Sequence, residues 1–199
     1  NCRDLTSITI PDSVTSIGVE AFRDCRDMTT VTIGNGVTSI EERTFRRCRG
    51  LTSITIGNGV TSIGTQAFVD CSSLASITIP DSVTSIGEEA FQSCTSLTSI
   101  SIGDGVTSIG EEAFWYCTSL TSITIPDSVT SIGDGAFGRC TALATIEVGV
   151  GNANYTEVNG VLFNREMTLL HTYPAPKTGA NYVIPDGVTS IGGAAFHSS

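Results

Sequence analysis

The 199-residue sequence predicts a right-handed repeat solenoid, with a parallel β-sheet along one face, short helical turns and extended segments on the others, and one β-hairpin insertion. Three observations predict this fold. All seven cysteines are spaced 23 residues apart, and a leucine or methionine follows each by three residues. Phenylalanine recurs at the same step from Phe22 to Phe137. Residues 74–96 and 97–119 are identical at 17 of 23 positions, so each repeat is expected to form one coil.

Each coil divides into four expected elements. Residues 5–10 end in alternating apolar and hydroxyl side chains, many of them β-branched, which is typical of a strand with one buried face. Residues 11–13 are Pro-Asp-Ser, replaced in other coils by Gly-Asn-Gly or Gly-Asp-Gly, and predict a turn. Residues 14–18 are expected to form a second short extended segment. Residues 88–91 and their counterparts are expected to form one helical turn, whose acidic residues suit the positive end of a helix.

Stacked coils are expected about 4.8 Å apart, the spacing of neighbouring strands, so each position of the repeat becomes a column along the solenoid. No coil can bury its apolar face alone, and stability is expected to come from neighbouring coils. The predicted interior consists of these positions and their equivalents: Leu5, Ile8, Ile10, Val14, Ile17, Ala21, Phe22 and Cys25.

We interpret residues 1–199 as a single solenoid, with regular coils over 1–148, an irregular hairpin-containing coil over 149–182 and a last partial coil over 183–199. The period breaks once, because the step from Ile125 to Ile184 is 59 residues. Neither end carries the polar, atypical repeat that caps a free solenoid. We therefore expect the sequence to be part of a longer protein, whose other domains would be partners of this one.

Composition excludes some partners. Ten basic and 20 acidic side chains give a net charge of −10, whereas a phosphate-binding surface needs a basic excess, so we expect no nucleic-acid partner. No apolar run approaches ~18 residues, so we expect no membrane insertion.

The repeated unit L-x-S-I-T-I-P-D-S-V-T-S-I-G-x-x-A-F-x-x-C-x-x, from Leu5 to Ala142 and again from Val183 to Phe196, resembles the BspA-like class of leucine-rich repeat proteins. Residues 155–174 also resemble a hairpin variant of that family. The resemblance implies a surface-exposed or secreted protein of host-associated bacteria or some protozoa, which binds host proteins in adhesion. The family has no shared catalytic motif, so it implies no active-site residues and no cofactor.

The seven cysteines share one position of the repeat and suggest two kinds of chemistry. They have no C-x-x-C pairing and no accompanying histidine, which argues against a metal site. Neighbouring Cα atoms about 5 Å apart would fall inside the disulfide range, so cross-coil disulfides stay open. We favour small, buried, structural thiols.

No catalytic constellation is apparent, and we predict that the protein is not an enzyme. Paired carboxylates such as Glu88-Glu89 could act in acid–base chemistry or bind calcium, but they lack the spacing of a calcium loop and suit solvated turns. The two histidines, His171 and His197, have no nucleophile partner, and we expect them to be structural or exposed.

Variation between coils concentrates beside the cysteines, in columns expected to face solvent. An arginine cluster there could bind an acidic partner or a sulfated glycan, although ion pairs with Asp4, Asp24 and Asp27 are the simpler explanation. Two adjacent aromatic residues at the same corner, Trp115 and Tyr116, could anchor a partner or pack against a neighbouring coil or the insertion. The candidate contact residues are Arg3, Arg23, Arg26, Arg46, Arg47, Arg49, Trp115 and Tyr116.

The predicted function is non-catalytic binding on a cell surface or in secreted form, directed at a host protein or glycan. One alternative is a structural spacer in a larger surface protein. Another is a surface of threonine columns, such as those of Thr15 and Thr9, that orders ice or binds glycans. The simpler explanation of these columns is strand propensity and solubility.

Overall fold

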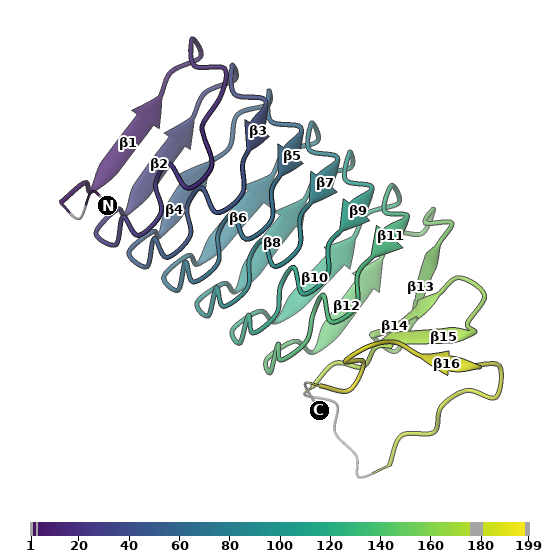
Figure 1. Ribbon diagram of the computed structural model, residues 1–199. Helices are drawn as coiled ribbons and strands as arrows, with labels where there is room; N and C mark the ends of the chain where they lie inside the picture. The colour runs from purple at the N-terminus through teal and green to yellow at the C-terminus, as the bar shows by residue number, and fades with distance from the viewer. Residues whose placement is uncertain (1, 3, 176–180, 198–199) are drawn as a thin grey trace.

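Two rows of parallel strands form two sides of a stack of coils in the computed structural model, which describes residues 2, 4–175 and 181–197 (Figure 1). One row, which we call the strand face, holds the long strands β1 (Ser7–Ile10), β2 (Thr30–Ile33), β4 (Ser53–Thr55), β6 (Ser76–Ile79), β8 (Ser99–Ile102), β10 (Ser122–Ile125) and β12 (Thr145–Val148). The second row holds the short strands β3 (Ser39–Ile40), β5 (Ser62–Ile63), β7 (Ser85–Ile86), β9 (Ser108–Ile109) and β11 (Ser131–Ile132). The repeat solenoid predicted from the 23-residue period is confirmed.

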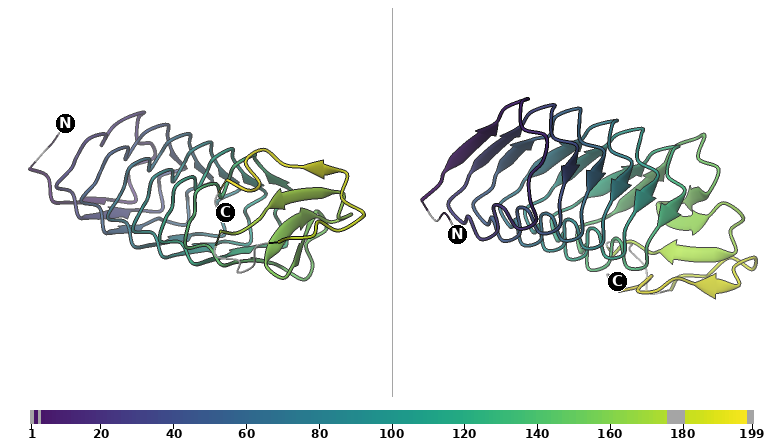
Figure 2. Two further views of the ribbon diagram at one scale, coloured as in Figure 1. Left: turned by 90° about the horizontal axis from the view of Figure 1, so that it is seen from below. Right: turned by 45° about the horizontal axis from the view of Figure 1, so that its top comes forward.

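Register in both rows follows the repeat. Ile77 of β6 pairs with Ile100 of β8, and Ser62 of β5 pairs with Ser85 of β7, in each case 23 residues apart. Along β6 the side chains alternate between exposed and buried, as the alternating pattern predicts. Equivalent residues of successive coils therefore lie side by side, and the coils are seen as successive rungs in Figure 2.

The third side of each coil is built from turns, not from the helical turn that we expected. No α- or 3₁₀-helix occurs in the described ranges, and thus none that could cross a membrane. Within a coil, the Ala90 N–H donates to the Gly87 carbonyl at 3.3 Å, as in a turn. The neighbouring Phe91 N–H donates to the Ala113 carbonyl of the next coil at 2.8 Å. Alternate amides thus bind the next coil, which a helix would not allow because its amides bond within the helix.

This alternation places two residues of each turn in the left-handed region. Their columns include Glu89 at φ 52° and Ser93 at φ 61°. Such angles are uncommon for residues other than glycine and cost about 1 kcal/mol or more, so the hydrogen bonds between coils must hold them. We call this side the turn side.

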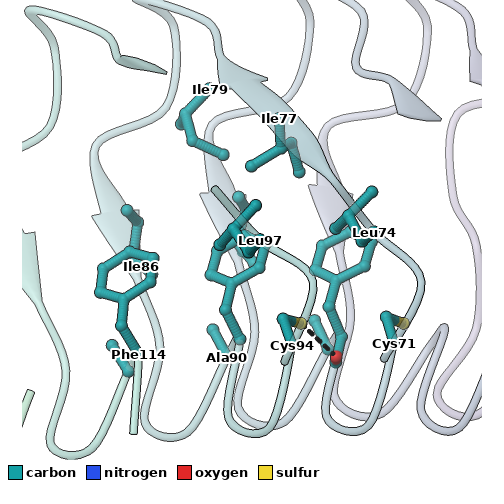
Figure 3. Packing of buried hydrophobic residues seen from close by; sticks show 14 of the residues in the cluster. Cys71, Leu74, Ile77, Ile79, Ile86, Ala90, Cys94, Leu97 and Phe114 are labelled. Carbon is teal, nitrogen blue, oxygen red and sulfur yellow. Dashed lines mark hydrogen bonds between the residues drawn. The ribbon is translucent and has the colours of Figure 1, made fainter. Parts of the chain in front are cut away.

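The interior is a set of columns, as predicted. Six phenylalanines from Phe22 to Phe137 stack with centroids 5.1–5.8 Å apart and planes within 9°. Figure 3 shows Leu74, Leu97 and the isoleucines packed beside this stack. In the first coil the prediction was too strong, since Ala21 is exposed and Phe22 only half-buried because no preceding coil covers them in the described structure.

The insertion and the last partial coil form a separate sheet of four strands: β13 (Tyr155–Val158), β14 (Val161–Asn164) and β15 (Leu169–Thr172) come from the insertion, and β16 (Ser190–Ile191) comes from the last coil. The first three are antiparallel, and β16 pairs with β15 in parallel. Asn159 and Gly160 both have positive φ and form the two-residue turn between β13 and β14, the geometry that Asn-Gly favours.

Candidate binding surfaces

The predicted contact residues that the structure describes lie along one edge of the solenoid, the corner edge, made of the two residues before each cysteine and the residue after it. In the first of these three columns, Arg23 and Arg46 precede Trp115. Arg46 and Trp115 are three coils apart, or about 14 Å at the spacing of neighbouring strands. The repeat thus places the arginines and the aromatic pair on one edge without bringing them into contact.

Four arginines of this region form ion pairs with acidic neighbours. Arg23 binds Glu20 at 2.8 Å and Arg26 binds Asp24 at 3.2 Å. Arg43 and Arg47 pair with Glu42 and Asp70 at 3.1 and 3.6 Å, respectively. Of the three acids that we expected as partners, only Asp24 forms ion pairs with described residues. The other acidic partners are Glu20 and Glu42 on the turn side and Asp70 of the neighbouring coil.

Among the described arginines of residues 1–49, two form no ion pair with a described residue, Arg46 and Arg49. The Nε of Arg46 is buried and has no hydrogen-bond partner there, while Arg49 is exposed. Arg3 lies outside the described residues. Burial disfavours the ionised form of Asp24, but the hydrogen bond and charge of Arg26, together with Arg47 and Arg23, outweigh this and lower the pKa of the carboxyl.

The aromatic pair divides into a packed and an exposed ring. Trp115 is half-buried and lies against the neighbouring coil, where a Cβ added at Gly138 would fall 2.2 Å from its ring. Its ring also makes an edge contact with His197 at 5.0 Å between centroids, and the Arg139 guanidinium lies 5.7 Å from its centre. Tyr116 is 43% exposed. Tyr116 is therefore the aromatic ring that a partner can reach.

Polar side chains on the turn side bind one another across coils. The Arg43 Nε donates to Gln66 at 2.7 Å, and the Gln66 amide donates to Glu89 at 2.9 Å. Burial raises the pKa of Glu112, and the charges of Glu89 and Glu111 raise it further. The described residues contain no group of three or more His, Cys, Asp or Glu side chains placed to hold a metal ion.

All seven cysteines are free thiols, and six of them are buried. Each buried thiol from Cys48 to Cys140 donates to a phenylalanine carbonyl of the preceding coil, as Cys94 does to Phe68 at 3.2 Å (Figure 3). Burial raises the pKa of Cys48 and of Cys140 to about 12, and raises those of the thiols between them well above the usual value. The predicted burial of the thiols is confirmed for six of the seven, whereas Cys2 is exposed. A buried, protonated thiol is a poor nucleophile.

His171 and Tyr155 bind the backbone of Ile132 in β11, the last strand of the row of short strands. The Ile132 N–H donates to the Tyr155 hydroxyl at 2.8 Å, and the Ile132 carbonyl lies 3.2 Å from His171 Nε2. Because a carbonyl can only accept, Nε2 carries the proton. Burial lowers the pKa of His171, against the effects of this hydrogen bond and of Asp134. His171 is structural, as expected, and His197 is exposed on the turn side.

The strand face carries a surface that we left out of the candidate residues. In its outward columns the side chains of Ser53, Thr55, Ser76 and Thr78 are exposed, and their hydroxyls bind no other described residue, whereas Thr124 of the same column as Thr55 donates to Glu147 at 3.2 Å. By contrast, the hydroxyl of Thr84, from the column of Thr15, donates to the carbonyl of the preceding coil at 3.1 Å. The sequence cannot separate the two kinds of column, because both are regular and both contain threonine.

Comparison with known proteins assigns the fold to a family. A family model described as a BspA type leucine rich repeat region matches residues 1–121 in 6 copies. Leucine-rich solenoids of this kind are typically non-catalytic. No curated protein matches the chain.

Three solved bacterial structures are similar over nearly all of the chain. A leucine rich cell surface protein from Faecalibacterium prausnitzii is 39% identical, covering 92% of this chain and 50% of its own, with a TM-score of 0.83. The pneumococcal vaccine antigen PcpA is 26% identical, with coverages of 96% and 52% and a TM-score of 0.84. A leucine-rich repeat protein from Eubacterium ventriosum is 32% identical, with coverages of 98% and 45% and a TM-score of 0.64.

The chain thus spans about half the length of these structures. The matched repeats and the identity to the Faecalibacterium protein agree with the stacked coils described above, and the chain belongs to the BspA-type leucine-rich repeat family.

Proposed function

We propose that the chain is a non-catalytic binding module of a bacterial cell surface, which engages a host protein through its corner edge. The observation that carries the proposal is the nature of the residues that vary along this edge. Inside the coils the columns are nearly uniform, whereas the corner edge changes from arginine to aromatic residues along the stack. Arginine and tyrosine are enriched at the energetic centres of protein interfaces.

Only some of the predicted contact residues of the corner edge are available to a partner. Arg46 and Arg49 lack ion pairs within the described ranges, and Tyr116 is exposed, whereas Arg23 is paired with Glu20. An unpaired arginine can bind a partner's carboxylate without first breaking an intramolecular pair. The surface location is supported by the similar Faecalibacterium protein, which is described as a cell surface protein.

The test is binding of the folded chain to an array of extracellular-matrix proteins and sulfated glycans at two salt concentrations. We expect a protein target whose affinity falls at least about tenfold in the double variant Arg46→Ala/Arg49→Ala or in Tyr116→Ala. The matched control is Arg23→Ala, which removes an arginine of the same column that is already paired.

Three outcomes contradict the proposal in different ways. Binding to sulfated glycans alone, abolished by high salt, would make the arginines an anionic-glycan site. Equal losses in Arg23→Ala and in the double variant would show a nonspecific charge effect. If the chain binds no member of the array although its circular dichroism spectrum shows that it is folded, the result would favour a structural spacer.

A further inference from the structure

A groove of about 630 Å³ crosses the strand face over β4, β6 and β8. Its floor carries hydroxyl side chains from three successive coils, including Ser53, Thr55, Ser76, Thr78 and Ser101. Across β6 and β8 these residues lie in register, since Ser76 pairs with Ser99 and Thr78 with Ser101, while β4 lies beside β6 as the edge of a separate sheet. The floor is therefore a regular array of short hydroxyls, repeated at the spacing of neighbouring strands.

These hydroxyls are free to bind a ligand. The hydroxyls of Thr55 and Thr78 make no hydrogen bond to any described residue, and both side chains are exposed. In the column of Thr61 and Thr84, by contrast, each hydroxyl donates to a backbone carbonyl at 3.0–3.1 Å. A free hydroxyl can both donate and accept, which is the pattern that a sugar hydroxyl also offers.

Two carboxylates border one end of the groove. Oδ1 of Asp81 accepts the Asp104 N–H at 3.0 Å, which fixes the side chain and leaves its second oxygen available. Neither Asp81 nor Asp104 forms an ion pair with a described residue, and no basic side chain lines the groove. The groove is thus negatively charged and suits a cation, while it would repel sulfate and uronate groups.

The composition of the groove differs from that of a protein interface. Its lining contains no aromatic side chain, arginine or methionine, the types that anchor protein partners. We propose that this groove binds a carbohydrate that carries amino groups: the hydroxyl columns bind sugar hydroxyls, and Asp81 and Asp104 bind the ammonium groups. The site lies on the strand face and not on the corner edge, so it goes beyond the function proposed above and does not depend on it.

Two matched probes test the proposal: a linear oligomer of glucosamine and the same oligomer fully N-acetylated, titrated calorimetrically at low and high salt below the pKa of the amine. We expect the amino form to bind more tightly, and its affinity to fall with salt because exposed charges are screened. Equal binding of the two oligomers, or binding of neither, would overturn the proposal.

Two pairs of variants locate the site. Thr55→Val/Thr78→Val removes two free hydroxyls without changing side-chain shape, and we expect an affinity loss of at least about fivefold. Thr61→Val/Thr84→Val is the matched control, expected to leave the affinity unchanged. If both pairs bind alike, the groove is not the site.

Asp81→Asn/Asp104→Asn tests the charges separately. Asparagine already occupies this column at Asn35, whose Oδ1 accepts the Asn58 N–H at 2.9 Å, so the backbone contact survives. We expect the variant to lose the preference for the amino form and the salt dependence, while folding normally. A retained preference would contradict the assignment of the ammonium groups to these carboxylates.

Discussion

The thiol of Cys71 illustrates how a single side chain supports the stack. It is fully buried and donates to the Phe45 carbonyl of the preceding coil at 3.2 Å. The same carbonyl also accepts the Cys48 N–H at 3.1 Å, so both contacts fix the corner of the coil. Cysteine suits this position because it is small and apolar and has one weak donor.

Alkaline pH should destabilise the protein through these thiols. Burial raises the pKa of five thiols, from Cys48 to Cys140, above the value of 9.0 expected in the unfolded chain. Above pH 9 the unfolded state therefore loses protons that the folded state keeps. Stability should be complete below pH 9 and fall as the pH rises toward 12, by about 1.4 kcal/mol per pH unit for each thiol.

The measurement is urea unfolding at several pH values between 8 and 11. Cys71→Ala should reduce the slope of the unfolding free energy by about 1.4 kcal/mol per pH unit above pH 9, while lowering the stability at pH 8. Cys2→Ala is the control, because Cys2 is exposed and should leave the slope unchanged. A slope that is the same in both variants would show that other groups control the alkaline transition.

Threonines in two columns should differ in their contributions to stability. Thr61 and Thr84 donate to backbone carbonyls, whereas Thr55 and Thr78 on the strand face have free hydroxyls. Thr61→Val/Thr84→Val should cost about 1 kcal/mol, because each removes a modest hydrogen bond. Thr55→Val/Thr78→Val should stay within about 0.5 kcal/mol of the parent, since valine favours strands. Urea unfolding of both pairs decides this, and equal costs would refute the distinction.

Among the elements, the strands were the most predictable from sequence. The alternation in residues 76–79 fixes both the strand and its buried face, and the 23-residue spacing fixes its neighbours. The turn side was mispredicted as helical because Glu88-Glu89-Ala90-Phe91 contains good helix formers. Its real conformation depends on hydrogen bonds to the next coil, such as that from Phe91 to Ala113, which local propensity does not contain.

The ion pairs and hydrogen bonds of side chains within the candidate surfaces could not be predicted from the sequence either. The period placed Arg46 and Trp115 on one edge correctly, because columns are set by the repeat alone. It could not tell that Arg23 is bound to Glu20 while Arg46 is not, since this depends on side-chain directions. For the same reason it could not tell that the hydroxyls of Thr55 and Thr78 are free, whereas those of Thr61 and Thr84 bind backbone carbonyls.

The start of the insertion is held by a buried amide, that of Asn152. Its nitrogen donates to the carbonyls of Pro126 and Val129 at 2.7 and 3.1 Å, and its oxygen accepts the N–H groups of Asn154 and Tyr155 at 2.8 Å each. All four contacts join the last regular coils to the start of β13. This buried network satisfies the backbone carbonyls of Pro126 and Val129 and the N–H groups of Asn154 and Tyr155 where the chain leaves the regular stack.

Asn152→Ala should therefore release the insertion before the rest of the molecule. It leaves buried donors and acceptors unpaired, at a cost of about 3 kcal/mol or more. Hydrogen exchange should show protection lost in β13, β14 and β15 but kept in the coils up to β8. The exposed Asn154→Ala is the control and should change little. Uniform loss of protection would show that the insertion and the coils unfold as one unit.

At the scale of the whole molecule, the insertion acts as a wedge. On the turn side the Gly135 N–H donates to the Gly193 carbonyl at 3.2 Å, so the coils that contain them still stack directly. In the row of short strands, β11 and β16 are separated by β15, which pairs with β16 and whose His171 reaches Ile132. The strands of the insertion consequently lie at an angle to the regular strands (Figures 1 and 2).

Removal of the wedge should straighten the solenoid. Deleting residues 149–184 joins Val148 to Pro185 and restores the 23-residue spacing, so that Ile191 falls in the column of Ile132. Coils in a solenoid interact chiefly with their neighbours, and the fused coil should therefore stack directly on β11. The Ile132 backbone groups, now bound by Tyr155 and His171, would instead pair with the Ser190–Ile191 strand.

A crystal structure or amide protection at Ser190–Ile191 would test this arrangement. The control is a deletion of residues 51–73, one complete repeat, which shortens the stack while keeping both the register and the wedge. It should retain the angled terminal sheet, whereas the 149–184 deletion should give a straight stack of equal coils. If the amides of Ser190–Ile191 are unprotected in the variant that lacks residues 149–184, the last coil needs the insertion in order to fold. The insertion would then be a required element of the fold and not only the cause of a bend.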